Sequence, residues 1–123
     1  MKQVTSKTRE ELLQSVANFY NSSNRGYLLG NCQYITAEGN RCAIGREVKN
    51  PKVLQKIGYA VQHSHIQAEL PKRLKVMGSE FLLRVQNFHD IHYNWNENGL
   101  TDKGKEFYNN TIDNFGLKLD HLK

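Results

Sequence analysis

The feature that most constrains the fold is a long amphipathic stretch in the C-terminal half, from Ser79 to about Trp95. At about 100° per residue, most of its large apolar side chains fall within one narrow stripe of a helix. That stripe contains Phe81, Val85, Phe88, His92 and Trp95. A helix with such a stripe has to bury it against other parts of the chain. The pattern therefore predicts a helix over residues 79–95 at the centre of the fold.

Two further helices carry clear start or stop signals. Thr8 followed by Glu11 is typical of a capping box and predicts a helix from about Thr8 to Tyr20. Thr101 is the expected cap of the last helix, and Gly116 is a natural left-handed stop for it.

Between these helices the pattern changes to short strands. Cys32–Ile35 and Arg41–Ile44 are predicted as two strands around a turn in which Gly39 supplies a positive φ. A lone hairpin is only marginally stable, so it has to pack on helices or gain a third strand. Tyr27–Leu29 is the candidate for that strand.

The middle of the chain is less clearly patterned. Asn50 and Pro51 predict the start of a short helix that Gly58 ends, whereas residues 59–70 could form a loop or another short helix. The length of 123 residues fits one compact domain. We therefore expect residues 1–123 to form a single, mostly helical α+β domain, with a small antiparallel sheet packed on the long helix.

The charge balance is moderately basic. Lysine and arginine number 17 against 12 acidic residues, which gives a net charge of +5 and a pI near 9.3. This excess favours an anionic partner such as a nucleotide, although a solvated surface without a partner is the alternative. No signal peptide is visible in the polar first residues, so none is expected, and no stretch approaches the roughly eighteen apolar residues of a membrane span. We expect a cytoplasmic protein with no membrane partner.

The two cysteines, Cys32 and Cys42, allow four interpretations: a disulfide, a metal site, a nucleophile, or small buried apolar groups. A reducing compartment weighs against the disulfide. Zinc would need His63 with His65, or His89, to complete its ligands, and structural zinc sites usually place cysteines about two to four residues apart. The wider spacing here argues against zinc, so we expect no metal and no cofactor.

The segment Cys42-Ala43-Ile44-Gly45 favours the nucleophile somewhat more than the metal. If a helix begins near Gly45, its amide groups would favour the thiolate of Cys42 and could stabilise an oxyanion. His89 is the candidate base for such a cysteine-dependent hydrolase or transferase. The alternative is that Cys42 and Ala43 alternate between the two faces of a small sheet.

The residues His89 to His92 resemble a catalytic cluster, but helical geometry separates them. Relative to the start of the apolar stripe, His92 lies about 20° around the helix, His89 about 80° and Asp90 about 180°. Asp90 is therefore expected to be a poor orienter for His89, and it could instead cap a loop or pair with an arginine. We expect His89 at the core edge with a partner in the hairpin, and His92 in the core, bonded to a backbone carbonyl.

Three arginines, Arg25, Arg41 and Arg46, suggest an anion site, because a planar guanidinium fork matches phosphate oxygens. With the polar and aromatic residues near them, the predicted ligand-binding set is Asn24, Arg25, Tyr27, Arg41, Arg46 and His89. A second basic run, with Lys72, Arg73 and Lys75, is typical of a solvated face. No phosphate loop, dinucleotide fingerprint or metalloprotease motif is present.

The two C-terminal helices, joined by a short turn containing glycine, are typical of a helix-turn-helix, which makes a DNA-binding regulator an alternative. The last helix, however, mixes both signs of charge: Lys103, Lys105 and Lys118 with Asp102, Glu106, Asp113 and Asp120. A helix that reads DNA is usually basic, so this pattern disfavours direct DNA binding.

Several separated motifs resemble a group of small proteins from phages and bacteria. They are Phe19-Tyr20-Asn21 with Asn24-Arg25, Cys32-Gln33-Tyr34, Cys42-Ala43-Ile44-Gly45, and Gln86 with His89-Asp90. The resemblance covers about residues 19–92 and transfers no catalytic role, because the group has no established activity. It implies a phage or prophage setting, in which many small proteins counter host defences, and hence the host cytoplasm.

These observations together predict a binding protein without a catalytic role. The expected partner is an anionic ligand or a host defence protein: a nucleotide-like signal, or machinery that handles nucleic acid. The alternatives are the enzyme using Cys42 and His89 and the DNA-binding regulator, and a homo-oligomer stays open. The functional hypothesis requires the hairpin to pack over the long helix beside His89.

Overall fold

The computed structural model describes residues 3–28 and 31–123, with only the backbone described for Leu28, Asn31 and Cys32. The longer helices are α1 (Arg9–Phe19), α5 (Ser79–Asp90) and α6 (Asp102–Phe115). The shorter helical elements are η1 (Gly45–Glu47), α2 (Pro51–Ile57), α3 (Ser64–Gln67), α4 (Lys72–Lys75) and η2 (His92–Asn94). Strand β1 (Tyr27–Leu28) pairs antiparallel with β2 (Asn31–Cys32), and β3 (Trp95–Asn96) with β4 (Gly99–Leu100).

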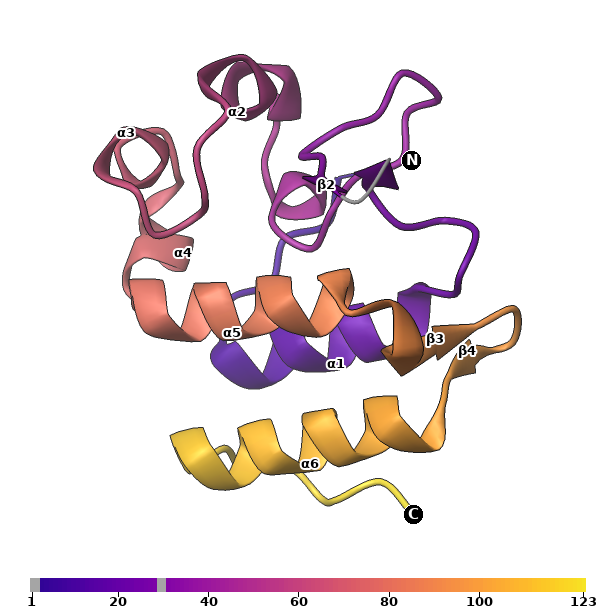
Figure 1. Ribbon diagram of the computed structural model, residues 1–123. Coiled ribbons are helices and arrows are strands. Elements are labelled where there is room, and N and C mark those ends of the chain that lie inside the picture. The colour runs from indigo at the N-terminus through magenta and orange to yellow at the C-terminus, as the bar shows by residue number, and fades with distance from the viewer. Residues whose placement is uncertain (1–2, 29–30) are drawn as a thin grey trace.

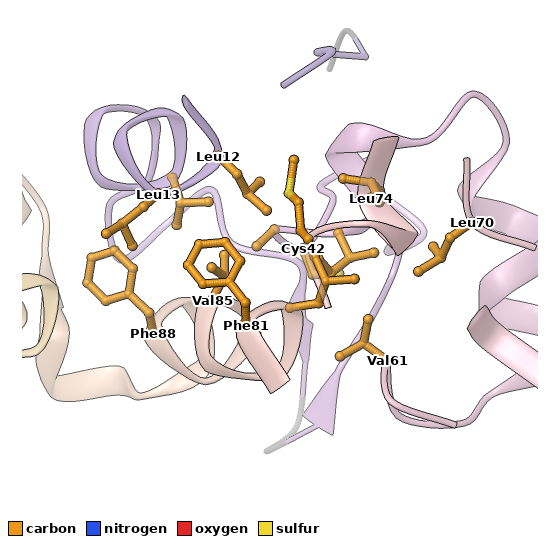
Figure 2. Close-up of a cluster of buried hydrophobic side chains, with 14 of the residues drawn as sticks. Leu12, Leu13, Cys42, Val61, Leu70, Leu74, Phe81, Val85 and Phe88 are labelled. Carbon is orange, nitrogen blue, oxygen red and sulfur yellow. The ribbon is translucent and has the colours of Figure 1, made fainter. Parts of the chain in front are cut away.

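The long helices form the centre of the molecule, as Figure 1 shows. Helix α5 contacts α1 and α6, while α2, α3 and α4 lie together on the side of α5 opposite to α6 (Figure 1). The core side chains of α1 and α5 meet those of the middle segment (Figure 2); the labelled ones are Leu12, Leu13, Cys42, Val61, Leu70, Leu74, Phe81, Val85 and Phe88. The expected mostly helical α+β fold is confirmed.

The caps predicted for α1 and α6 are present. Thr8 Oγ1 accepts a hydrogen bond from the backbone amide of Glu11 at 3.0 Å, and Thr101 does the same for Gly104 at 3.1 Å. The carboxylate of Glu11 accepts from the amide of Lys7, one position before the residue that a standard capping box would use. Gly116 ends α6 with a φ of 60°. These helix ends depend on local hydrogen bonds, which is why their signals were visible in the sequence.

Helix α5 ends at Asp90, so the prediction of a helix running to Trp95 was wrong. The last carbonyls of α5 are taken by side chains instead of by further helical amides. The indole Nε1 of Trp95 donates to the carbonyls of Phe88 and His89, and Arg25 Nη1 donates to those of His89 and Asp90. Trp95 is buried from β3 rather than from the helix.

The same early end of α5 changes the environment of His92. This residue lies in η2 and is exposed, so its predicted place in the core was wrong. Beyond Asp90 the chain no longer follows the helical spacing on which that prediction depended.

The predicted hairpin is only partly formed. A single bridge joins Ile35 to Arg41, and Gly39 has the expected positive φ of 90°. Cys42–Ile44 is not a strand, because the chain turns there into η1, where the amide of Arg46 bonds to the carbonyl of Cys42. Tyr27–Leu28 does form a strand, β1, but it pairs with Asn31–Cys32 in a two-stranded sheet instead of adding a third strand to the predicted hairpin; Leu29 lies outside the described residues.

The middle segment forms short helices, which decides the alternative left open for residues 59–70. Helix α2 starts at Pro51 and ends at Ile57, and Gly58 caps it with a φ of 79°, as expected. Helix α3 follows at residues 64–67. Among the described residues, no helix has the length and apolar character that crossing a membrane requires.

Arg73 in α4 forms a buried ion pair, so the prediction that this basic run is a solvated face was wrong for that residue. Its Nη1 lies 2.8 Å from Oε1 of Glu47, whose side chain is 1% exposed. The carboxylate of Glu47 also accepts from the amide and the hydroxyl of Ser6, and the backbone carbonyl of Glu47 accepts from Arg73 Nη2. This network joins the N-terminal segment, η1 and α4.

Candidate functional site

The imidazole of His89 is fully buried at the end of α5, and both of its nitrogens have partners. Nε2 accepts a hydrogen bond from the backbone amide of Gly26 at 3.2 Å. Because Nε2 is an acceptor in this bond, the ring proton belongs on Nδ1, which lies 2.7 Å from Asp90 Oδ1 and donates to it. The expectation that Asp90 would be a poor orienter for His89 was therefore wrong.

Burial is the main cause that lowers the pKa of His89, and the hydrogen bond to Asp90 opposes it. A neutral imidazole is what this geometry requires, since a protonated Nε2 would face the amide hydrogen of Gly26. The ring of Tyr20 also packs edge-on against His89, with centroids 4.7 Å apart. His89 is thus a fixed structural contact between α5 and residues 26–45, which contain β1, β2 and the predicted hairpin and are called the ribbon below.

The ribbon lies against α5 as the functional hypothesis required. A Cβ added to Gly26 would come within 3.0 Å of backbone atoms of Gln33, Arg41 and Cys42, so only glycine fits this crossing. On the next turn of α5, Gln86 Oε1 accepts from the amide of Ile44 at 3.4 Å. The close approach at Gly26 packs the segments of the ribbon together, and the hydrogen bonds to His89 and Gln86 hold the ribbon on α5.

Cys42 is fully buried within the core cluster (Figure 2). Its Sγ accepts from the amide of Gly45 at 3.3 Å, so a helical turn does begin there, as the nucleophile hypothesis required. The nitrogens of His89, however, bond to Gly26 and Asp90 rather than to the thiol. The side chain of Cys32 lies outside the described residues, within which no cluster of three or more histidine, cysteine or acidic side chains could hold a metal.

Arg25 caps the C-terminus of α5. Its Nη1 lies 3.0 Å from the carbonyl of His89 and 2.9 Å from that of Asp90, and its guanidinium stacks 5.0 Å from the ring centre of Tyr27. Burial lowers the pKa of Arg25, and the charge of Asp90 opposes that shift. Asn24, beside it, closes a turn by bonding to the amide of Asn21.

The other two predicted arginines bond to different parts of the chain. Arg46 is 7% exposed, stacks 3.9 Å from the ring centre of Phe19 and donates to the carbonyl and hydroxyl of Ser15. Burial is the main cause that lowers its pKa. Arg41 donates to the carbonyl of Val48. The structure thus gives the three guanidinium groups three separate sets of internal partners.

A polar cavity of about 420 Å³ lies next to Asp90. Its walls come from α5, from the end of α2 with the following loop, and from the chain after β2. The polar lining residues are Gln33, Tyr34, Gln55, Tyr59, Gln86, Asn87 and Asp90. None of the predicted ligand-binding residues lines this cavity: Asn24, Arg25, Tyr27, Arg41, Arg46 and His89 all lie outside its lining. A second cavity of about 430 Å³, next to Val48 and Leu70, contains none of them either. The first cavity is the candidate site because Asp90, which lines it, is hydrogen-bonded to His89.

Some polar groups in this cavity are held internally and others are not. Gln55 accepts from the amide of Tyr34 and donates to Gln33 Oε1, both at 2.7 Å. Asp90 Oδ1 accepts from His89 Nδ1 and, at 3.0 Å, from Gln86 Nε2. Within the described part of the chain, Gln33 Nε2, the amide of Asn87 and Asp90 Oδ2 have no hydrogen-bond partner. These groups are available to a ligand.

An aromatic pair stands at the edge of the cavity. Tyr59 is 49% exposed, and His63 stacks on it with ring centroids 4.0 Å apart. The hydroxyl of Tyr34 donates to the carbonyl of Tyr59 at 2.7 Å, which fixes the backbone of this loop. The cavity thus offers both a flat ring and hydrogen-bonding groups to one small molecule.

The sequence pointed to only part of this site. Gln33, Gln86 and Asp90 belong to the motifs behind the resemblance, but Gln55, Tyr59 and Asn87 carried no signal, because their value depends on which segments fold together. Comparisons of the chain with protein-family models, with curated proteins and with solved structures gave no match. The functional proposal depends on the cavity itself.

Proposed function

We propose that this chain is a non-catalytic binding protein that takes a small nucleotide-like ligand into the cavity beside Asp90. The observation that carries the proposal is the cavity of about 420 Å³ lined by four carboxamides, a carboxylate and two tyrosines. Its volume is within the range of small-molecule sites, roughly 300–1,000 Å³. Carboxamides and carboxylates are among the side chains that pair with base edges, and aromatic rings stack on base faces.

The basic character of the chain supports an anionic group on that ligand. Arg25 does not line the cavity, but its Nη1 bonds to the backbone carbonyl of Asp90, so its guanidinium lies beside the residue that does. Its Nη2 has no hydrogen-bond partner among the described residues. A phosphate that extends past Asp90 along the end of α5 would meet this cation. The net charge of +5 favours the approach of such a ligand.

Binding rather than catalysis is favoured by the positions of Cys42 and His89. Both side chains are fully buried, and both nitrogens of His89 serve internal hydrogen bonds. The resemblance to small phage proteins adds a biological hypothesis, in which the chain sequesters a nucleotide signal of a host defence system in the host cytoplasm.

The proposal is tested by titrating the protein with the four ribonucleoside monophosphates and following binding by calorimetry. The Asn87→Ala variant removes an exposed amide that forms no internal hydrogen bond, so it should weaken binding about fivefold to tenfold without loss of stability. Asn110→Ala is the matched control, because Asn110 is an exposed asparagine on α6, away from this cavity. Absence of binding at millimolar nucleotide, or equal affinities for both variants, would reject the proposal.

A further inference from the structure

We propose that Asp90 Oδ2 selects the ligand of this cavity and that it favours a base with an exocyclic amino group. The inference rests on the proposed function and adds to it a specificity residue and a class of base: adenine or cytosine type rather than hypoxanthine or uracil type.

The position of Asp90 is fixed before any ligand arrives. Its Oδ1 accepts two hydrogen bonds, from His89 Nδ1 at 2.7 Å and from Gln86 Nε2 at 3.0 Å. His89 is itself held by the amide of Gly26, so the carboxylate belongs to a network that reaches the ribbon. Asp90 Oδ2 is the oxygen that this network leaves unused. A group held this firmly loses little side-chain entropy when a ligand binds.

The chemistry of that oxygen determines what it can select. An ionised carboxylate only accepts hydrogen bonds, so Asp90 Oδ2 pairs with a donor such as an exocyclic amino group. A keto oxygen at the same place would bring two acceptors together and leave both without a hydrogen. Asn87 and Gln33 do not discriminate in this way, because a carboxamide carries both a donor and an acceptor. A base whose pose is fixed, with its exocyclic group at this oxygen, cannot shift to offer the ring N–H of a keto base instead. In that pose Asp90 is the one group of this set that distinguishes an amino from a keto base.

The aromatic edge of the cavity explains why we place a base, and not the ribose, next to Asp90. Tyr59 lines the cavity, and His63 covers one face of its ring at a centroid distance of 4.0 Å. A base that stacks on Tyr59 within the cavity shares it with Asn87 and Asp90, which line the same cavity. Its polar edge can then reach α5 while the ribose and phosphate extend outward.

Two pairs of nucleotides test this inference directly. Adenosine monophosphate carries an amino group where inosine monophosphate carries a keto oxygen, and cytidine and uridine monophosphate differ in the same way. In each pair the adjacent ring nitrogen is an acceptor in the amino base and an N–H donor in the keto base. The wild-type chain should bind the amino member of each pair about tenfold more tightly or better, because a hydrogen bond to a charged acceptor is lost in the other.

The Asp90→Asn variant provides the sharper test. An asparagine can keep its carbonyl oxygen on His89 and Gln86 while its amide nitrogen replaces Oδ2, which turns the free acceptor into a donor. The preference should then disappear or reverse toward inosine and uridine monophosphate. Asp120→Asn is the matched control, because Asp120 is exposed and does not line this cavity. It should leave the preference unchanged.

The outcomes separate the two proposals. If nucleotides bind but the wild type shows no amino preference, or if a folded Asp90→Asn variant keeps the wild-type preference, the role of Asp90 is refuted while the proposed function stands. If no nucleotide binds, both are refuted. Thermal unfolding checks that Asp90→Asn is folded, and if it is not, the comparison on the wild-type chain decides alone.

Discussion

The Nδ1 atom of His89 lies 2.7 Å from Oδ1 of the next residue, Asp90, although an ideal helix would point these two side chains in different directions. The contact is possible because α5 ends at Asp90. One residue of this pair is fully buried beneath the ribbon, and the other lines the candidate cavity. The pair therefore connects the packing of the fold to the proposed ligand.

The first prediction concerns pH. Burial lowers the pKa of His89 in the folded chain, so below the unfolded pKa of about 6.5 the unfolded state binds more protons than the folded state. The free energy of unfolding should therefore be at its full value above about pH 6.5 and should fall as the pH decreases below it. Urea unfolding from pH 8 to pH 5 measures this. A His89→Gln variant should show a flatter dependence, and an identical slope would contradict the prediction.

The second prediction concerns the ion pair between Arg73 and Glu47. Arg73→Ala leaves a carboxylate that is 1% exposed without its cation, and removal of one partner of a buried pair usually costs about 3–5 kcal/mol. Chemical denaturation measures the loss. Lys72→Ala in the same short helix is the control and should change stability by less than about 0.5 kcal/mol, because Lys72 is exposed. Similar losses in both variants would show that the pair contributes little.

The third prediction compares two glycines in the ribbon region. Gly26→Ala places a methyl group within 3.0 Å of backbone atoms of three residues, so we expect a loss above about 4 kcal/mol or failure to fold. Gly39→Ala meets nothing within 4 Å, and its strain comes only from a φ of 90°, which costs about 1–2 kcal/mol. Thermal unfolding of both variants gives the ranking. A tolerated Gly26→Ala would mean that the backbone at Gly26 does not pass so close to Gln33, Arg41 and Cys42.

The fourth prediction concerns the reactivity of Cys42. Because its thiol is fully buried and bonded to the amide of Gly45, a thiol reagent should modify Cys42 only when the chain opens. The rate of labelling, followed at this residue by peptide mass spectrometry, should rise in step with denaturant. Rapid labelling in native conditions would restore the enzyme hypothesis.

The sequence predicted the elements that depend on local signals. The caps at Thr8 and Thr101 and the stop at Gly116 involve residues close in the chain, so their patterns were readable. The end of α5 was not, because Arg25 contributes to it from 64 residues away. Arg73 was misjudged for the same reason, since its partner Glu47 lies 26 residues earlier.

The candidate site was predictable only where its residues stood in motifs. His89 was correctly expected beside the ribbon, but Arg46 gave no sign that it would stack on Phe19. Gln55 of α2 and Asn87 of α5 line the same cavity, and no pattern within either helix predicts that they lie close together. Spacing identified chemically useful side chains, whereas tertiary packing decided which of them stay available to a ligand.

The most direct test of the central claim is a nuclear magnetic resonance titration of the wild-type chain with adenosine monophosphate. Binding in the cavity predicts that the side-chain amide signals of Gln33 and Asn87 and the ring signals of Tyr59 shift together and saturate, while those of Asn110 stay in place. Saturating shifts at Asn110 or around the cavity beside Val48, with none at Asn87, would contradict the claim, and so would a spectrum that does not change.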